Sequence, residues 1–499
     1  MTPQCAGEFC PLFEQPHIVN NPSNCCGMTQ GGERRRMLNA ILGGLAIFIL
    51  IGLTAALFLP KFIRHQLEQQ MKRATSRLFT ESYTKNIFEG VTALRKFGIQ
   101  WAVENELRSH HPAALLKPIG THRPFPHFDG LLFSSVQLHR RALNDSEPVT
   151  VATVIGKRAD RPMTLSLPVM TSAMGYGVAL NKPFARAIAK GTALAGTAFN
   201  TGQGPALREF RELAHRLVVQ YHGAAWRPPD EILSVADMIE IRFGQGANAG
   251  CGTAIAGDSV NSEIAKDMGG PQSQNKNGEF YIPAGIPGIH TNDELKQLVK
   301  DLRKIGRGVP IAIKMAAGNG LEMDLALAVQ ADVDVIVLDG AQGGTFSSPA
   351  ILVDDFGIPT LAALCRAVRF LRDNGLRDRV DLVISGGIRT PGDMLKALAL
   401  GADAMYIGSA ALFATMHAQI TKTVPFEPPT QLAWATGQLY SLFNEDEGAG
   451  SLANFFTSCS EELQMGARAL GKCSIHDVCA EDLVAWDPEV ARITGIPLT

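Results

Sequence analysis

The residues that most constrain the fold are 380–412, with the sequence VDLVISGGIRTPGDMLKALALGADAMYIGSAAL. An apolar run at 382–384 ends at Gly386 and Gly387, which predicts a buried strand followed by backbone that passes close to a bulky group. A helical segment follows, and a second apolar run at 404–407 ends at Gly408. The stretch therefore predicts two buried strands joined by a helix, and a glycine loop after each strand.

The residues after the first glycine loop indicate which bulky group lies there. Thr390, Pro391 and Asp393 have the order of an N-cap, a first helical residue and an acidic first turn. Free N–H groups at a helix N-terminus bind anions such as phosphate. A phosphate site in the loops after the last two strands is frequent in (β/α)8 barrels, so the stretch predicts a barrel and a phosphorylated ligand together. The alternative is a βαβ unit whose glycines only form tight turns.

Apolar runs alternate regularly with helical segments from about residue 165 onward, which is typical of a parallel α/β fold. We predict a (β/α)8 TIM barrel with eight strands, five of whose connecting helices are clear in the sequence. An interruption at 244–290, rich in Gly, Asn and Pro, follows the fourth strand, where barrel insertions commonly cover the active site. The predicted strands are 165–172, 195–200, 217–221, 238–243, 309–315, 333–339, 382–385 and 404–408, and the predicted helices are 183–194, 206–215, 292–305, 321–330 and 360–374.

The N-terminal part of the chain has a different character. Residues 1–36 show no periodicity and are predicted to be a disordered tail, and 37–60 form an uncharged run long enough for a transmembrane helix. The alternative for this run is a buried hairpin or core helix. Three arginines precede the run and five lysines and arginines follow it up to residue 77, which predicts a single-pass membrane protein with a cytoplasmic catalytic body.

The remaining boundaries follow from the same patterns. Residues 61–160 are predicted to be a helical and irregular connection whose loop histidines (110, 111, 122 and 127) lack metal-ligand spacing, 161–431 the barrel, and 432–499 a helical C-terminal extension. The extension's predicted packing residues are Phe455, Leu463, Met465, Leu470 and Leu483.

Charge and cysteine usage exclude several classes of function. A net charge of -2 gives no basic surface for nucleic acid, so no nucleic-acid partner is expected. The nine cysteines include no CxxC and no Cys/His ligand spacing, so no metal site is predicted. Cys473 and Cys479 are close enough in sequence to bridge, but reduced packing cysteines suit a cytoplasmic body better.

Most of the predicted strands are followed by residues that are unusual in a core. Because the carboxyl ends of barrel strands gather at one face, these scattered residues are predicted to line a single pocket. The residues are Ser172, Ala173, Met174, Asn200, His222, Gln245, Lys314, Gly343, Gly344 and Thr345.

Lys314 is the most informative of these residues, because a lysine within an apolar strand needs a negative partner. A flavin is one such partner, since its ring gains negative charge near N1 and the C2 oxygen on reduction. The alternatives are a core acid or contact with solvent.

Taken together, FNTGQG, IEIRFGQGANAG, AIKMAAG, DGAQGGTFSSP and the 380–412 stretch closely resemble the FMN-binding synthase domain of glutamate synthase, over roughly 168–412. The resemblance implies an FMN barrel in which reduced flavin passes hydride to the imine of 2-oxoglutarate. It implies that Ser172, Ala173, Met174 and Asn200 lie against the flavin, Lys314 near N1, and Gly386, Gly387, Gly408 and Ser409 at the phosphate. With the strand-end Gln245, Gly343 and Gly344, and Arg389 beside the phosphate, these residues form the predicted cofactor site.

The chain also departs from the family pattern. The family has Glu where this chain has Gln203, and Lys and Glu where it has Asn248 and Cys251. The cysteines that hold the family's iron–sulfur cluster have no counterpart in residues 411–431, so no iron–sulfur cluster is expected. No glutaminase half is expected either, because a membrane span is predicted where the family has that half. The stand-alone, membrane-anchored members of the family are the best match.

The leading interpretation is a membrane-anchored FMN oxidoreductase that makes L-glutamate from 2-oxoglutarate or acts on a related amine or imine. Lys314, Gln203 and Gln245 are its predicted catalytic residues, the substrate is a 2-oxoacid or amino acid, and a separate electron donor or reductase is a possible partner. One alternative is an isomerase-like barrel that binds another phosphorylated ligand without flavin. The other is a non-catalytic, membrane-anchored barrel used for interactions, which the changes at Gln203, Asn248 and Cys251 would suit.

Overall fold

The computed structural model describes residues 30–499 and divides into two compact units, one ending at Glu106 and the other Leu107–Thr499. Residues 1–29 of the predicted disordered tail lie outside the described residues. The remainder of that predicted tail, 30–36, is helical, because the first helix begins at Gln30.

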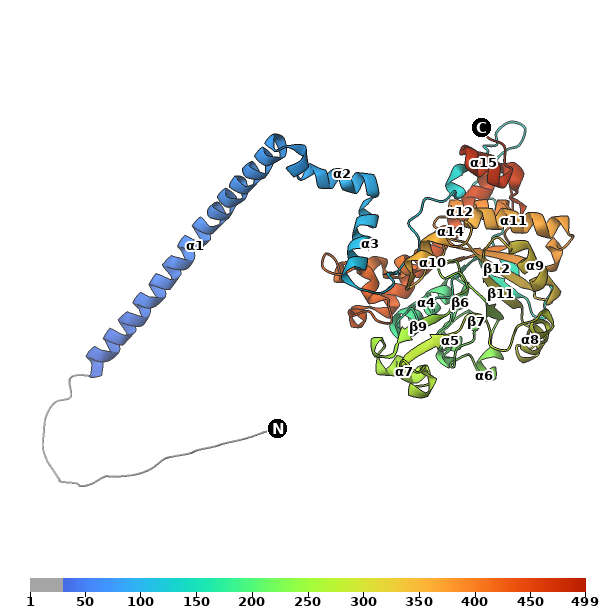
Figure 1. Cartoon of the computed structure of the whole chain (residues 1–499), viewed down its shortest axis with the longest axis horizontal. Helices are drawn as coiled ribbons and strands as arrows, with labels where there is room; N and C mark the ends of the chain where they lie inside the picture. The colour runs from blue at the N-terminus through green and yellow to red at the C-terminus, as the bar shows by residue number, and fades with distance from the viewer. Residues whose placement is uncertain (1–29) are drawn as a thin grey trace, which may run out of the picture. The chain divides into compact units, whose positions relative to one another are not determined.

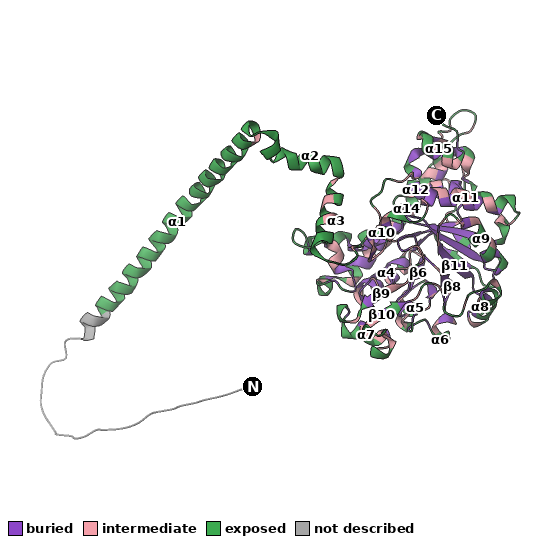
Figure 2. Cartoon of the chain, in the orientation of Figure 1, coloured by how far each residue is buried: buried purple, intermediate pink, exposed green. Residues whose placement is uncertain are grey.

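The first unit is dominated by one long helix, α1 (Gln30–Thr80). By length and composition α1 can cross a membrane, with a mean hydropathy of 2.6 in its most apolar window and no buried residue in that window (Figure 2). The predicted span ends at residue 60, but α1 continues through Pro60 because the following residues are rich in good helix formers such as Leu, Gln, Lys and Arg. The short helices η1 (Tyr83–Lys85) and α2 (Phe88–Phe97) follow, and α3 (Ile99–His110) crosses the boundary between the units.

The second unit contains the barrel. In the described part of the chain, parallel strands form one eight-stranded sheet in the order β5-β15-β14-β12-β11-β8-β7-β6. Two side chains link the ends of this order: Thr171 Oγ1 donates to Ala198 O at 3.1 Å and Thr197 Oγ1 donates to Val169 O, so the sheet closes into a TIM-like barrel. The strands are β5 (Val169–Thr171), β6 (Ala198–Asn200), β7 (Arg216–Tyr221), β8 (Met238–Arg242), β11 (Ile311–Ala316), β12 (Val335–Asp339), β14 (Asp381–Ser385) and β15 (Ala404–Ile407).

These strands coincide with the eight predicted ones, with one difference. The predicted strand 165–172 is two elements, β4 (Met163–Leu165) and β5, because Pro168 between them has no N–H to donate to a sheet. Figure 1 shows α8, α9 and α11 outside β11 and β12, as a (β/α)8 fold requires. The helices that connect the strands are α4 (Lys182–Leu194), α5 (Arg208–Leu213), α6 (Asp230–Leu233), α8 (Asn292–Ile305), α9 (Leu321–Gln330), α10 (Ala350–Asp355), α11 (Thr360–Asp373) and α12 (Pro391–Ala399).

A small hairpin closes the amino end of the barrel. Strands β3 (Thr153–Ile155) and β4 pair antiparallel, and Ile155, Met163 and Leu165 are buried in one cluster with residues at the starts of the barrel strands. The amide N–H of Gly156 donates to Asp381 Oδ2 at 2.6 Å and ties the hairpin to β14. Because this hairpin fills the amino end of the barrel with apolar side chains, a polar site is expected at the carboxyl end.

Two further segments surround the carboxyl end. The insertion at 244–290 folds into the hairpin β9 (Thr253–Ala256) and β10 (Glu279–Ile282), with α7 (Ser262–Asp267) between the strands. After α13 (Ser409–Met416), the extension provides α14 (Glu445–Ala469), which packs on α4 and α13, and then α15 (Pro488–Thr494). Its strand β16 (Leu483–Ala485) pairs with β2 (Leu131–Phe133).

The predicted packing residues of the extension are mostly inside. Leu463, Leu470 and Leu483 are buried and Phe455 is partly buried, whereas the prediction for Met465 is wrong, since its side chain is 59% exposed. Met465 lies on the solvent-exposed side of α14. Cys473 and Cys479 are free thiols.

Candidate functional site

A cavity of about 1380 Å³ lies at the carboxyl ends of the barrel strands. Residues 252–256 of the insertion form part of its wall, as the position of the insertion after β8 predicted. Most of the predicted site residues lie on this one cavity, although they come from distant parts of the sequence. They are Ser172, Ala173, Met174, Gln203, Gln245, Lys314, Gly344, Gly386, Gly387, Arg389, Gly408 and Ser409.

Two predicted cofactor residues, Asn200 and Gly343, and the strand-end His222 are not on the cavity wall. Asn200 is the last residue of β6, and its Nδ2 donates to Glu240 Oε1 at 3.0 Å and to Tyr406 OH at 3.1 Å inside the barrel. His222 is 1% exposed, and burial lowers its pKa to about 3, so the imidazole is neutral. Gly343 lies behind Gly344, where a Cβ would come within 2.8 Å of Asp339 Oδ1.

The glycine loop after β14 has a backbone that other residues adopt with strain. Gly386 and Gly387 have φ angles of 106° and 78°. A Cβ at Gly386 would lie 2.7 Å from Thr360 Oγ1, and one at Gly387 would lie 2.9 Å from the Cβ of Gln342. Both positions therefore require glycine, and both leave open backbone facing the cavity.

The helix N-terminus at the cavity belongs to α13, not to α12 as the sequence suggested. The first turn of α12 is occupied by side chains of its own: Asp393 N donates to Thr390 Oγ1 at 3.2 Å, and Asp393 Oδ2 accepts from Arg389 N at 3.1 Å. The α13 helix starts after Gly408 with no side-chain cap, and residues 408–410 line the cavity. Uncapped N–H groups there are suited to an anion.

Lys314 lies on the cavity wall. It also pairs with a core acid, which was one of the alternatives to a flavin as its partner. Its Nζ is 3.5 Å from Asp339 Oδ2, and both side chains are at most 5% exposed. The other carboxylate oxygen, Asp339 Oδ1, is buried and has no partner among the described residues. The ammonium also lies 5.7 Å from the ring centroid of Tyr406. Lys314 and Asp339 thus present a charged pair to the cavity.

The sequence interpretation missed Arg242, which lies beside Lys314 in the register of β8 and β11. Its guanidinium is 2% exposed, and burial lowers its pKa to about 10. In the orientation that satisfies the Gln203 amide, Gln203 Oε1 accepts from Arg242 Nη1 at 3.1 Å and from Nε at 2.9 Å. Asn248 Oδ1 accepts from Arg242 Nη2 at 3.3 Å. Gln203 and Asn248, two positions that depart from the family pattern, therefore both accept hydrogen bonds from the buried guanidinium of Arg242.

Glu240, one layer deeper, was missed as well. It is fully buried, and its Oε1 accepts from Asn200 Nδ2 and from Gln220 Nε2 at 2.7 Å. Burial raises the pKa of Tyr406, which keeps this phenol neutral. The signal that could have shown this layer is the alternation Ile-Glu-Ile-Arg at 239–242, where charged residues occupy every second position of a buried strand.

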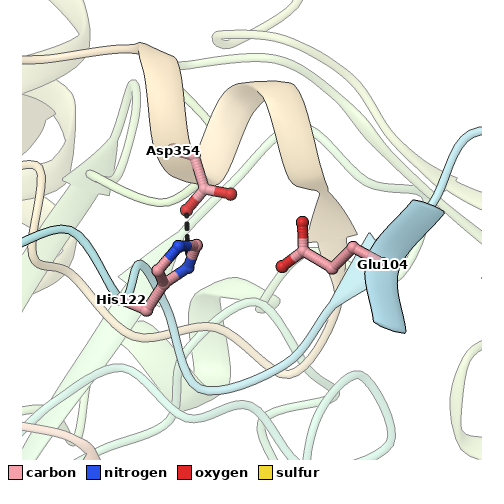
Figure 3. A group of neighbouring side chains, drawn as sticks. All are labelled: Glu104, His122 and Asp354. Carbon is pink, nitrogen blue, oxygen red and sulfur yellow. Dashed lines mark ion pairs between the residues drawn. The ribbon is translucent and has the colours of Figure 1, made fainter. Parts of the chain in front are cut away.

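The loop histidine His122 lies beside ordinary protein partners. Figure 3 shows the ion pair between His122 Nδ1 and Asp354 Oδ1, 3.8 Å apart. The buried Lys117 also meets Asp354, with 2.7 Å between Nζ and Oδ2. Thr121 Oγ1 donates to Asp354 Oδ1 at 2.8 Å. His122 Nδ1 accepts a hydrogen bond from Lys117 Nζ at 3.0 Å, so a hydrogen-bonded loop histidine accounts for this group.

Comparison with known proteins is consistent with this geometry. The family model for the conserved region in glutamate synthase matches residues 134–473. A glutamate synthase large subunit-like protein of Rhizobium meliloti is 33% identical over 77% of this chain and 90% of its own. An archaeal-type glutamate synthase [NADPH] of Thermotoga sp. is 32% identical over 77% of this chain and 78% of its own.

Similarity to solved structures is more distant. A mutant flavocytochrome b2 with pyruvate bound has a TM-score of 0.46 and 18% identity, and the match covers 73% of this chain and 80% of that one.

Proposed function

Because the chain belongs to the glutamate synthase family, an oxidoreductase family, we propose that it is an FMN-dependent enzyme that forms L-glutamate by reductive amination of 2-oxoglutarate, or acts on a related amine or imine. The observation that carries this proposal is the meeting of two glycine loops, an uncapped helix start and a buried lysine on one cavity.

The residues present fit FMN. The cavity is large enough for a mononucleotide with a substrate beside it, and the glycines at 386 and 387 present backbone without side chains to the cavity. Gly386, Gly387, Gly408 and Ser409 would hold that phosphate through backbone N–H groups and a hydroxyl. Bound FMN supplies hydride transfer at its N5. Lys314 would place an ammonium beside the ring, and Gln203 and Gln245 would orient the substrate by hydrogen bonds.

The electron source is a separate donor or reductase in this proposal. The Thermotoga relative is named for NADPH, and the same reductant is the first to test here. Purified full-length protein should be yellow and show a flavin spectrum that bleaches on reduction and recovers with 2-oxoglutarate and ammonia. Colourless protein that binds another phosphorylated compound would favour the isomerase-like alternative. Bound flavin without turnover would favour the interaction role that the changed residues Gln203, Asn248 and Cys251 suit.

Replacing Lys314 by Gln tests its role through a reduction potential. Loss of the ammonium should destabilise the anionic reduced ring, so the two-electron potential should fall by about 30 mV, a roughly tenfold change in the equilibrium. Spectroelectrochemical titration measures this. The double variant with Asp339→Asn avoids a lone buried carboxylate, and Lys300→Gln on the exposed face of α8 is the control. An unchanged potential in the single variant Lys314→Gln would place Lys314 away from the flavin.

We also propose that α1 anchors the protein with its body in the cytoplasm, on the basis of the apolar run and the basic residues after it. The protein should stay in membranes after an alkaline carbonate wash. In inverted membrane vesicles, protease should digest a C-terminal tag and leave an N-terminal tag protected. The opposite pattern would reverse the orientation, and release by carbonate would mean that α1 is not a span.

A further inference from the structure

Residues 116–129, which we call the strap, contribute to the cavity although they precede the segment that matches the family, 134–473. At one end, strand β1 (Leu116–Lys117) pairs antiparallel with β13 (Ser348–Pro349) in the loop after β12. Ile119 N donates to Thr345 O at 2.8 Å, and Leu116 and Ile119 line the cavity. The first end of the strap is therefore attached to the glycine loop that contains Gly343 and Gly344.

The other end of the strap meets the glycine loop after β14. The side chain of His127 is 9% exposed, and a Cβ at Gly387 would lie 3.1 Å from its Nε2. Arg389 Nη2 lies 3.1 Å from Nδ1 of His127, which accepts from it because a guanidinium can only donate. Burial lowers the pKa of His127. Strands β12 and β14 are neighbours in the sheet, so the strap runs between two adjacent glycine loops.

Arg389 joins this end of the strap to the barrel. Its Nη2 also donates to Asp129 Oδ1 of the strap, and its Nε lies 3.4 Å from Asp393 Oδ2 at the start of α12. A second link is Lys396 Nζ, which donates to Phe128 O at 3.1 Å. The guanidinium thus has two carboxylates and an imidazole around it. These groups balance the charge of the Arg389 guanidinium and fix its orientation. The guanidinium is therefore poorly placed to serve mainly as a ligand for a phosphate in the cavity.

We propose that His127 and Asp129 are positioning residues that fasten the strap, through Arg389, as a cover over the Gly343–Gly344 and Gly386–Gly387 loops. In this arrangement Arg389 links the strap to the Gly386–Gly387 loop, and we call this link the clasp. A ligand held by both loops leaves only after the strap has lifted. The strap then controls how fast the cofactor exchanges, while the backbone N–H groups beneath it set how tightly the cofactor binds.

Hydrogen–deuterium exchange of the full-length protein tests the clasp without any ligand. Asp129 is 62% exposed on its side chain, so Asp129→Asn should fold, and exchange in residues 116–129 should become about two- to fivefold faster, as expected for a partly exposed ion pair. Asp129→Glu should restore slow exchange. Asp446→Asn, which breaks an exposed ion pair with Lys190, is the matched control and should leave the strap unchanged. Unchanged exchange in Asp129→Asn would overturn the proposal.

FMN binding to apo-protein gives a second readout, which rests on the proposed function. Opening a cover speeds entry and exit together, so Asp129→Asn should raise the association and dissociation rates of FMN by similar factors, about two- to fivefold, with little change in Kd. The double variant with His127→Phe should raise both rates further.

Faster dissociation with unchanged association would show instead that these residues and Arg389 hold the phosphate directly, and would overturn the cover. If the wild-type protein binds no FMN, the proposed function fails, and hydrogen exchange alone then decides whether the clasp exists.

Discussion

Gly387→Asp is expected to yield colourless protein that retains the barrel. The residue at 387 has a φ of 78°, and any side chain there meets Gln342 and His127 at contact distances of 2.9 and 3.1 Å. The added carboxylate would also repel the phosphate that the loop is proposed to hold. Displacement of the loop by these contacts and like-charge repulsion of the phosphate together should cost about 4 kcal/mol of binding free energy, or roughly a thousandfold in FMN affinity. Flavin content of the purified protein and the Kd of the apo-protein for FMN measure the effect.

A matched control separates loss of the site from loss of the fold. Gly375 has a similar φ of 65°, but a Cβ there meets nothing within 4 Å. Gly375→Asp therefore imposes the same backbone strain and the same charge far from the cavity, and it should keep full flavin. Stoichiometric FMN in Gly387→Asp would show that the phosphate is not bound at this loop.

The second large effect concerns Gln203 and Asn248, whose side-chain amides are hydrogen-bonded to Arg242. The wild-type protein is expected to form little glutamate from 2-oxoglutarate and ammonia, because Asn248 replaces a lysine of the family pattern. A charge-assisted contact contributes about 1.5–3 kcal/mol, so its loss lowers affinity roughly ten- to a hundredfold. Gln203→Glu together with Asn248→Lys should recover this factor. Glutamate production with chemically reduced flavin at varied 2-oxoglutarate is the assay.

The geometry explains why both changes are needed. Asn248 Oδ1 is 3.3 Å from Arg242 Nη2, so Asn248→Lys alone would bring an ammonium against a buried guanidinium and should lower stability. Gln203→Glu places a carboxylate on the other edge of Arg242 and balances the added charge. If the double variant binds FMN and still makes no more glutamate than wild type, the substrate is a different acid or amine.

The strands could be predicted from the sequence because each is a continuous apolar run that ends at Gly, Asn or a polar residue, and such runs suit a sheet buried on both faces. The site was predictable where an unusual residue interrupts or follows an apolar run, as at Lys314 in β11 and Gly386 after β14. Glu240 was missed because it lies inside β8, and Arg242 was missed because the predicted strand continued to residue 243, whereas β8 ends at Arg242. Only the barrel's curvature brings them to Asn200 and Gln203. The strap was missed because its role depends on contacts with loops more than 200 residues away, such as His127 with Arg389.

The β3–β4 hairpin has a consequence for the order of the reaction. Its apolar side chains fill the amino end of the barrel, and the cavity lies at the other end, with the strand-end loops and the insertion in its wall. We therefore expect the reductant and the acceptor to enter the cavity from this one side, one after the other. We expect initial-rate plots at several donor concentrations to be parallel lines, as for an enzyme that releases its first product before it admits its second substrate.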